Sequence, residues 1–286
     1  MGIITLIRPK HWIKNIFIFI PAFFAGTILS FENLFLLILT FFAFSFVASS
    51  IYILNDYKDI ESDKKHPKKK FRPLASGKVS KRNALMLFFI LLIASTALMY
   101  STRIHVLSII YAYFILNIFY TLVLKRIAIV DIVCISVGFV LRVFAGAFAV
   151  DVPVSEWLIL MVFLISLLMG FAKRRDDLLI KEESGITLRK SIDGYTKPFI
   201  DLSVTMMAGV VIVCYIMYVT HESVISRIGN SYLYLTSVFV IIGILRYLQI
   251  TFVEEKSGSP TDILWHDRFL QIVILLWIFF FGYILY

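Results

Sequence analysis

Charged residues are scarce in this sequence. Lysine, arginine, aspartate and glutamate make up 16% of its 286 residues, whereas a soluble domain has about 25%. Cysteine is scarcer still, because only Cys134 and Cys214 occur and each lies inside an apolar run. We therefore expect neither a disulfide bond nor a cysteine-based metal site. Together with a hydrophobic content of 60%, these shortages exclude an ordinary soluble domain and indicate a polytopic membrane protein.

Apolar stretches long enough to cross a bilayer recur along the whole chain. A membrane-spanning helix needs about 20 largely apolar residues, and no low-complexity segment or soluble domain interrupts the series. We predict a single all-α integral membrane domain over residues 1–286, with about nine transmembrane helices. The predicted spans are residues 16–31, 34–54, 84–101, 104–124, 127–149, 156–172, 199–219, 230–252 and 269–286.

The lysines and arginines gather on one side of this predicted topology. If the N-terminus lies inside, all 28 except Arg103, Arg142, Arg227 and Arg246 fall in inner segments. Cytoplasmic segments of membrane proteins carry such an excess of basic residues. We therefore place the N-terminus inside, and we assign the net charge of +9 to a cytoplasmic rim facing lipid headgroups. This distribution argues against a nucleic-acid partner.

A cluster of carboxylates follows the second predicted span. If that helix continues past Leu54, a turn of 100° per residue places Asp56, Asp59 and Asp63 on one face, with Asn55 at its edge. Oxygen ligands of this kind suit Mg²⁺ or Mn²⁺. Because Asp56 and Asp63 would be about 10 Å apart along a helix, we expect Asp56 and Asp59 nearest the metal. Asp63 would hold a second ion or a water.

A run of cations comes directly after these acids. It is interrupted by Pro67 and Pro73, so we expect a loop beside the metal-binding face. Ammonium and guanidinium groups next to a metal site are suited to a polyanion, above all a diphosphate. The cations of this loop are Lys64, Lys65, Lys68, Lys69, Lys70 and Arg72.

The spacing Asn55-Asp56-x-x-Asp59-x-x-x-Asp63 resembles the NDxxDxxxD signature of the UbiA-type membrane prenyltransferase superfamily. Members bind a diphosphate substrate through Mg²⁺ and aspartates, and they transfer its organic group to an acceptor. The resemblance implies a UbiA-like helical bundle with a cytoplasm-facing polar cavity. Residues 55–83 and 173–198 would form its cytoplasmic substrate-binding loops. The protein itself would be integral to the cytoplasmic membrane of a bacterium.

The second motif of the superfamily is altered in this chain. Where members usually carry a further aspartate-rich motif, "GFAKRRDDLLIKEES" offers Asp176 and Asp177, which are adjacent and therefore about 100° apart on a helix. They are led by Lys173, Arg174 and Arg175. We expect these cations to bind substrate and to replace part of a second metal site.

Other stretches resemble the decaprenyl-phosphate phosphoribosyltransferase branch, among them "IRPKHWIKNIFIFIPAFF" and "HPKKKFRPLASGKV". The resemblance implies transfer of the 5-phosphoribosyl group from 5-phosphoribosyl 1-diphosphate to a polyprenyl monophosphate, either decaprenyl or undecaprenyl, with release of pyrophosphate. A prenyltransferase that uses a prenyl diphosphate and an aromatic or other acceptor stays open as the alternative. A transporter is disfavoured, because coupling ions usually bind near the bilayer midplane, whereas these aspartates lie at the rim of the membrane.

A few polar residues inside or beside the spans complete the predicted site. Ionisable side chains in a span usually face a cavity or a partner, so Asp131 joins the three aspartates as a predicted catalytic residue. Arg142 either pairs within the core or lines the lipid-phosphate pocket. Tyr120 and Lys125 close the fourth span, where Lys125 either contacts phosphate or snorkels to the interface. The resemblance makes Lys14 a contact for the lipid phosphate. The oligomeric state is left open, and a homo-oligomer is compatible with these features.

Overall fold

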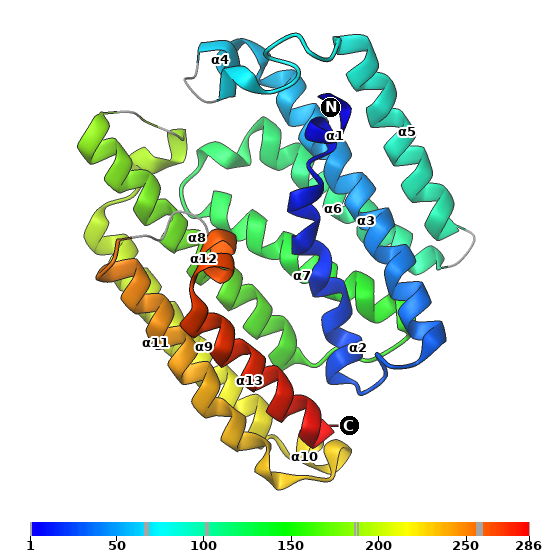
Figure 1. Cartoon of the computed structure of the whole chain (residues 1–286), viewed down its shortest axis with the longest axis vertical. Coiled ribbons are helices and arrows are strands. Elements are labelled where there is room, and N and C mark those ends of the chain that lie inside the picture. Colours follow the sequence, from blue (N-terminus) through cyan, green and yellow to red (C-terminus); the bar gives the residue numbers. More distant parts are fainter. Residues whose placement is uncertain are drawn as a thin grey trace. The chain divides into compact units, whose positions relative to one another are not determined.

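The structure, a computed structural model, describes residues 2–65, 69–100, 103–185, 187, 189–255 and 260–285, and within these ranges every regular element is a helix (Figure 1). The chain divides into two compact units. Unit 1 comprises residues 1–122 and 141–154, and unit 2 comprises residues 123–140 and 155–286. Helix α7 (Val130–Val150) therefore contributes its first half to unit 2 and its second half to unit 1.

Unit 1 is built around α3, which packs against α1, η1, α5 and α6. The N-terminal segment runs alongside α3 in the opposite direction (Figure 1). Two hydrogen bonds set this register, from Trp12 Nε1 to Ser49 Oγ and from Asn15 Nδ2 to Ser45 Oγ. The elements are α1 (Gly2–Ile7), η1 (Pro9–Phe19), α2 (Ile20–Phe24), α3 (Phe31–Lys58), α4 (Ile60–Lys65), η2 (Lys69–Phe71), α5 (Lys81–Tyr100) and α6 (Ile104–Leu122).

Unit 2 is a second set of long helices, in which α8 packs against α9, α9 against α11, and α11 against α13. Its core includes Ile132, Leu168, Ile192 and Ile200, which are almost completely buried. The elements are η3 (Leu124–Arg126), α8 (Glu156–Ser184), η4 (Lys190–Gly194), α9 (Lys197–Thr220), α10 (Glu222–Ile228), η5 (Ser231–Thr236), α11 (Ser237–Phe252), α12 (Pro260–His266) and α13 (Arg268–Leu285).

Local sequence signals explain where several of these helices begin and end. Thr196 caps α9, since its hydroxyl oxygen accepts a hydrogen bond from the Phe199 backbone N–H, as threonine commonly does at a helix start. Helix α8 ends at Gly185, whose φ of 68° lies in the left-handed region that favours glycine. The same helix continues through 173–184, so the first half of the predicted loop at 173–198 is helical.

Within the described ranges, eight helices are long and apolar enough to cross a membrane, and they correspond to eight of the nine predicted spans. The expected span at 16–31 differs. There the described chain forms η1 and the short helix α2, followed by a turn with Gly26 at a φ of 72°. Pro21 lies at the start of α2, and proline has no backbone N–H to continue a regular helical ladder. The fold is that of an all-helical membrane protein.

Candidate active site

Two carboxylates and two guanidinium groups meet at the end of α3 in unit 1. Arg72 Nη1 lies 3.1 Å from Asp56 Oδ1 and 2.8 Å from Asp63 Oδ2. Arg8 Nη2 lies 2.6 Å from the same oxygen of Asp56. Asp56 and Asp63 are only 2% and 3% exposed, whereas the side chains of Arg8 and Arg72 are partly exposed. Charges of both signs are therefore concentrated in one partly accessible cluster.

A break in the helix brings Asp56 and Asp63 together. Helix α3 ends at Lys58, and Asp59 follows as its C-cap with φ −93° and ψ 6° before α4 begins. Because of this break, Asp56 and Asp63 both contact Arg72 Nη1, although a continuous helix would separate them. Arg72 thus bridges Asp56 and Asp63, and half-buried Asp59 stays a predicted metal ligand.

Asn55 turns toward α6 rather than toward the acids. Its Oδ1 accepts a hydrogen bond of 2.6 Å from Thr121 Oγ1, and Lys58 Nζ donates to the Thr121 carbonyl oxygen at 3.4 Å. These two bonds fix the last turn of α3 against α6. Asn55 therefore supports the helix that carries Asp56.

The carboxylates of this cluster suit a divalent metal. Asp56 Oδ2 is buried and has no hydrogen-bond partner in the described part of the chain, which leaves a charged oxygen open to a cation. No group of three or more histidine, cysteine or acidic side chains arranged for a metal occurs among those residues. Mg²⁺ does not need one, because it is usually held by one or two carboxylates together with waters and substrate phosphates. Asp56 and Asp63 meet that requirement.

Arg8 is a further member of this cluster, and its position in the sequence indicates only a charge at the cytoplasmic rim. Its guanidinium lies 5.0 Å from the ring centre of Tyr52, one helical turn before Asp56 on α3. Arg8 and Asp56 are 48 positions apart, so no local spacing connects them. Only the antiparallel pairing of the N-terminal segment with α3 reveals the contact.

Arg142 is held in the interior of unit 1. Its Nε donates to Asn15 Oδ1 at 2.8 Å, and its Nη2 donates to the Tyr113 hydroxyl at 3.0 Å. The guanidinium also lies over the rings of Phe44 and Tyr113, at 5.0 and 4.7 Å. Since the residue is 4% exposed, the structure favours the core-pairing alternative for Arg142 over the lipid-phosphate pocket.

Asp131 organises a separate buried network in unit 2. Its Oδ2 accepts hydrogen bonds from Arg174 Nε at 2.8 Å and Ser191 Oγ at 2.9 Å, and its Oδ1 accepts one from the Tyr195 hydroxyl at 2.9 Å. Asp131 is fully buried. Both of its oxygens thus bind the protein itself, so this structure places Asp131 as a structural anchor of the 189–195 segment. Its role as a catalytic residue stays a prediction.

Tyr195 remains protonated in this network. Burial raises the pKa of Tyr195 well above its ordinary value, and the adjacent Asp131 carboxylate raises this pKa further. The hydroxyl accepts a hydrogen bond of 2.6 Å from the Ile129 N–H while it donates to Asp131. Ile129 has a φ of 68°, which is rare for a β-branched residue, and the bond to Tyr195 holds it there.

The arginines expected to form a free phosphate-binding cluster are paired with acids instead. Arg174 Nη1 contacts Asp177 at 3.1 Å, in addition to Asp131. Arg175 contacts Asp201 at 2.9 Å and donates to the Thr251 carbonyl at 3.0 Å. Because Arg174 and Arg175 are 1% and 3% exposed, a buried position in a helical core compels pairing with carboxylates. Their role as substrate contacts stays a prediction.

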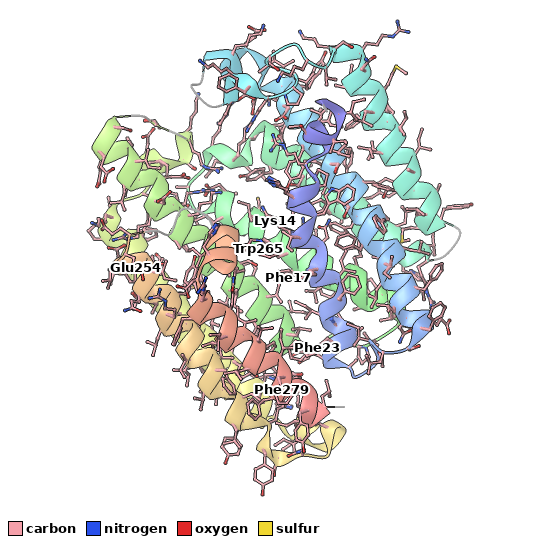
Figure 2. The ribbon with its side chains drawn as sticks, viewed as in Figure 1. Lys14, Phe17, Phe23, Glu254, Trp265 and Phe279 are labelled. Atoms are coloured by element: carbon pink, nitrogen blue, oxygen red, sulfur yellow. The ribbon has the colours of Figure 1, made fainter. Side chains whose placement is uncertain are left out.

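Among the described residues, the remaining predicted contacts are half-buried side chains. Lys14 lies on η1, the segment that also carries Phe17 and leads to Phe23 on α2 (Figure 2). Lys68 lies outside the described residues. The other members of this half-buried set are Tyr120, Lys125 and Lys173.

Comparisons with known proteins place these units in a family. The model of the UbiA prenyltransferase family matches residues 16–273. A decaprenyl-phosphate phosphoribosyltransferase of Mycolicibacterium smegmatis is 32% identical, over 97% of this chain and 90% of its own length. The protein of that name from Corynebacterium glutamicum is 31% identical, over 97% and 85%.

A solved structure shares the fold. The UbiA homolog from Archaeoglobus fulgidus, bound to DMAPP and Mg²⁺, superimposes with a TM-score of 0.71 at 18% identity, covering 100% of this chain and 99% of the homolog. The chain is therefore a transferase of the UbiA prenyltransferase family.

Proposed function

We propose that this protein transfers the 5-phosphoribosyl group from 5-phosphoribosyl 1-diphosphate to a polyprenyl monophosphate and releases pyrophosphate. The observation that supports this choice is the similarity, along nearly the whole chain, to relatives named decaprenyl-phosphate phosphoribosyltransferase. The excess of basic residues in the predicted inner segments supports a cytoplasmic site in the cytoplasmic membrane.

The Asp56–Asp63 cluster is the proposed site for the diphosphate of the donor. Asp56 and Asp63 would hold Mg²⁺, with Asp59 as a further oxygen ligand, and the bound ion supplies neutralisation of the departing pyrophosphate. Arg72 bridges the two carboxylates and is partly exposed, so it would turn from them to the phosphate oxygens. Guanidinium groups form strong charge-assisted bonds with phosphate.

The acceptor needs no catalytic base. A phosphate monoester has a second pKa near 6, so the lipid phosphate already carries a nucleophilic oxygen at neutral pH. That oxygen attacks C1 of the ribose, the bond from C1 to the diphosphate oxygen breaks, and pyrophosphate takes the electron pair. Catalysis then depends on positioning and on charge stabilisation. Half-buried Lys14, Lys125 and Lys173 are the proposed phosphate contacts.

A transfer assay tests the proposal. Purified full-length protein receives Mg²⁺, decaprenyl or undecaprenyl phosphate, and phosphoribosyl diphosphate labelled in the ribose. We expect the label to enter the organic phase and pyrophosphate to appear in equal amount. If no label moves, while a prenyl diphosphate is consumed with an aromatic acceptor, the protein is a prenyltransferase and the proposal is wrong.

A further inference from the structure

Arg8 occupies an unfavourable backbone conformation at the junction of α1 and η1. Its φ of 51° and ψ of 60° lie in the left-handed region, which residues with a side chain rarely adopt. Pro9 follows, and the residue before a proline is normally extended. Such outliers persist only where the surrounding structure imposes them, and they cluster at functional sites.

Both flanks of Arg8 are tied to α3. Leu6 is fully buried in a cluster with Ile53 and Ile60. The Ile7 carbonyl accepts a hydrogen bond of 2.7 Å from Ser49 Oγ, which in turn accepts one from the Trp12 indole. These contacts fix the backbone before and after Arg8. Its side chain therefore meets α3 at one defined position, beside Tyr52 and Asp56.

The side chain of Arg8 is held from two directions. Its guanidinium lies over the ring of Tyr52 at 5.0 Å, and its Nη2 contacts Asp56 Oδ1 at 2.6 Å. Tyr52 and Asp56 are one turn apart on α3 and therefore share a face. Arg8 thus spans one helical turn and ends on a single oxygen of the carboxylate.

The two oxygens of Asp56 differ as a result. Oδ1 receives both Arg8 and Arg72, whereas Oδ2 is buried and makes no hydrogen bond in the described part of the chain. A carboxylate anchored through one oxygen cannot rotate freely, so the other oxygen keeps a fixed direction. Arrangements of this kind orient metal ligands in proteins.

We propose that Arg8 is a positioning residue for the metal site: it anchors Asp56 through Oδ1 so that Oδ2 is presented to the divalent ion. The proposal rests on the proposed function only in taking Asp56 as a metal ligand. Arg72 has a different part, because its nitrogen lies between Asp56 and Asp63, where it competes with an ion for the carboxylates.

Electrostatics and positioning predict opposite effects of removing Arg8. A nearby positive charge repels a divalent ion, so charge alone would make Arg8→Gln bind metal more tightly. Loss of the anchor would weaken metal binding. Removing a group that orients a metal ligand typically lowers the metal affinity by about 10- to 100-fold. Lys10 lies two residues away and is exposed, so Lys10→Gln removes a charge from the same segment without touching Asp56.

The experiment measures binding of Mn²⁺ alone to the purified full-length protein in detergent, by the paramagnetic resonance signal of free Mn²⁺. We expect Arg8→Gln to raise the dissociation constant about 10- to 100-fold, Lys10→Gln to leave it unchanged, and Arg72→Gln to lower it. Unchanged or tighter binding in Arg8→Gln overturns the proposal, and so does a wild-type protein that binds no Mn²⁺.

Two further measurements keep the result interpretable. If Arg8→Gln does not fold, Arg8→Lys is used, since lysine keeps the charge but loses the planar fork; binding as tight as in the wild type then counts against the proposal. Because no donor or acceptor is present, the outcome is independent of the transfer assay. Wild-type protein that binds Mn²⁺ but transfers no phosphoribosyl group refutes the proposed function and leaves the role of Arg8 standing.

Discussion

Arg174 Nε lies 2.8 Å from Asp131 Oδ2, and each side chain is about 1% exposed. This ion pair ties the middle of α8 to the start of α7 within unit 2. Ser191 and Tyr195 complete the set of donors around Asp131. A carboxylate that the sequence indicates as catalytic is therefore, in the folded chain, the centre of a structural network.

Asp131→Asn should destabilise the protein strongly. Removing one partner of a buried ion pair leaves the other charge uncompensated, at a cost of about 3–5 kcal/mol. The midpoint of thermal unfolding in detergent measures the loss. Asp193→Asn is the control, because Asp193 pairs with Lys181 at the surface, where its side chain is 65% exposed, and should cost less than about 1 kcal/mol. Equal stability of Asp131→Asn and wild type would contradict the structural role.

Asp56→Asn and Asp63→Asn should each abolish phosphoribosyl transfer. The two carboxylates both contact the Arg72 guanidinium, so they lie close enough together to bind one ion. A neutral amide binds Mg²⁺ less well than a carboxylate. We expect the turnover rate to fall by at least about 100-fold, while the protein is still produced and folded. Ser62→Ala, at an exposed position between them, should keep normal turnover. Near-normal activity in either aspartate variant would remove the argument for a metal site.

Metal removal should stop the reaction reversibly. A chelator is expected to abolish transfer, and added Mg²⁺ to restore it. In Arg72→Gln, Mg²⁺ should raise the unfolding temperature more than in wild type, because the competing guanidinium has gone and a ligand stabilises in proportion to its affinity. A smaller Mg²⁺ effect in this variant would show that Arg72 does not compete with the ion.

Gly146→Ala should destabilise unit 1. Alanine normally favours a helix over glycine by about 1 kcal/mol, but a methyl group at Gly146 would overlap the Ile18 carbonyl of η1. Overpacking of this kind costs about 1–3 kcal/mol. Gly209 of α9 has open space around it, so Gly209→Ala should be neutral or stabilising. The unfolding temperatures of the two variants test this prediction. A gain in stability in Gly146→Ala would exclude the close approach of η1 to Gly146.

Tyr195→Phe should remove an alkaline destabilisation. Burial raises the pKa of Tyr195 in the folded protein, whereas in the unfolded chain it is about 10. The stabilisation from the protonated hydroxyl is therefore complete below about pH 10 and declines as the pH rises toward the folded pKa. Loss of the hydrogen bonds should lower the stability of the variant by about 1.5–3 kcal/mol. As the pH rises above about 10, however, the stability of the variant should decrease less steeply than that of the wild type. Parallel pH profiles of the unfolding temperature would contradict this.

The composition and order of apolar runs were sufficient to predict the fold class. Eight of nine spans correspond to helices because 20 apolar residues in a row have few stable alternatives in a bilayer. The exception, 16–31, contains Pro21, and packing against α3 selects a 3₁₀ segment there. The NDxxDxxxD spacing likewise predicted an acidic site after the second span, where the structure has Asp56 and Asp63 on one guanidinium group.

The sequence by itself therefore determined the membrane class, the helices and the positions of the acidic motif, because these depend on hydrophobicity and on neighbours within a turn or two. Only the tertiary structure decided which charges meet. The antiparallel N-terminal segment brought Arg8 to Asp56, and burial paired Arg174 with Asp131 and Arg175 with Asp201. Such partners lie tens of residues apart, and a charge removed from water must be paired with whatever the packing brings near.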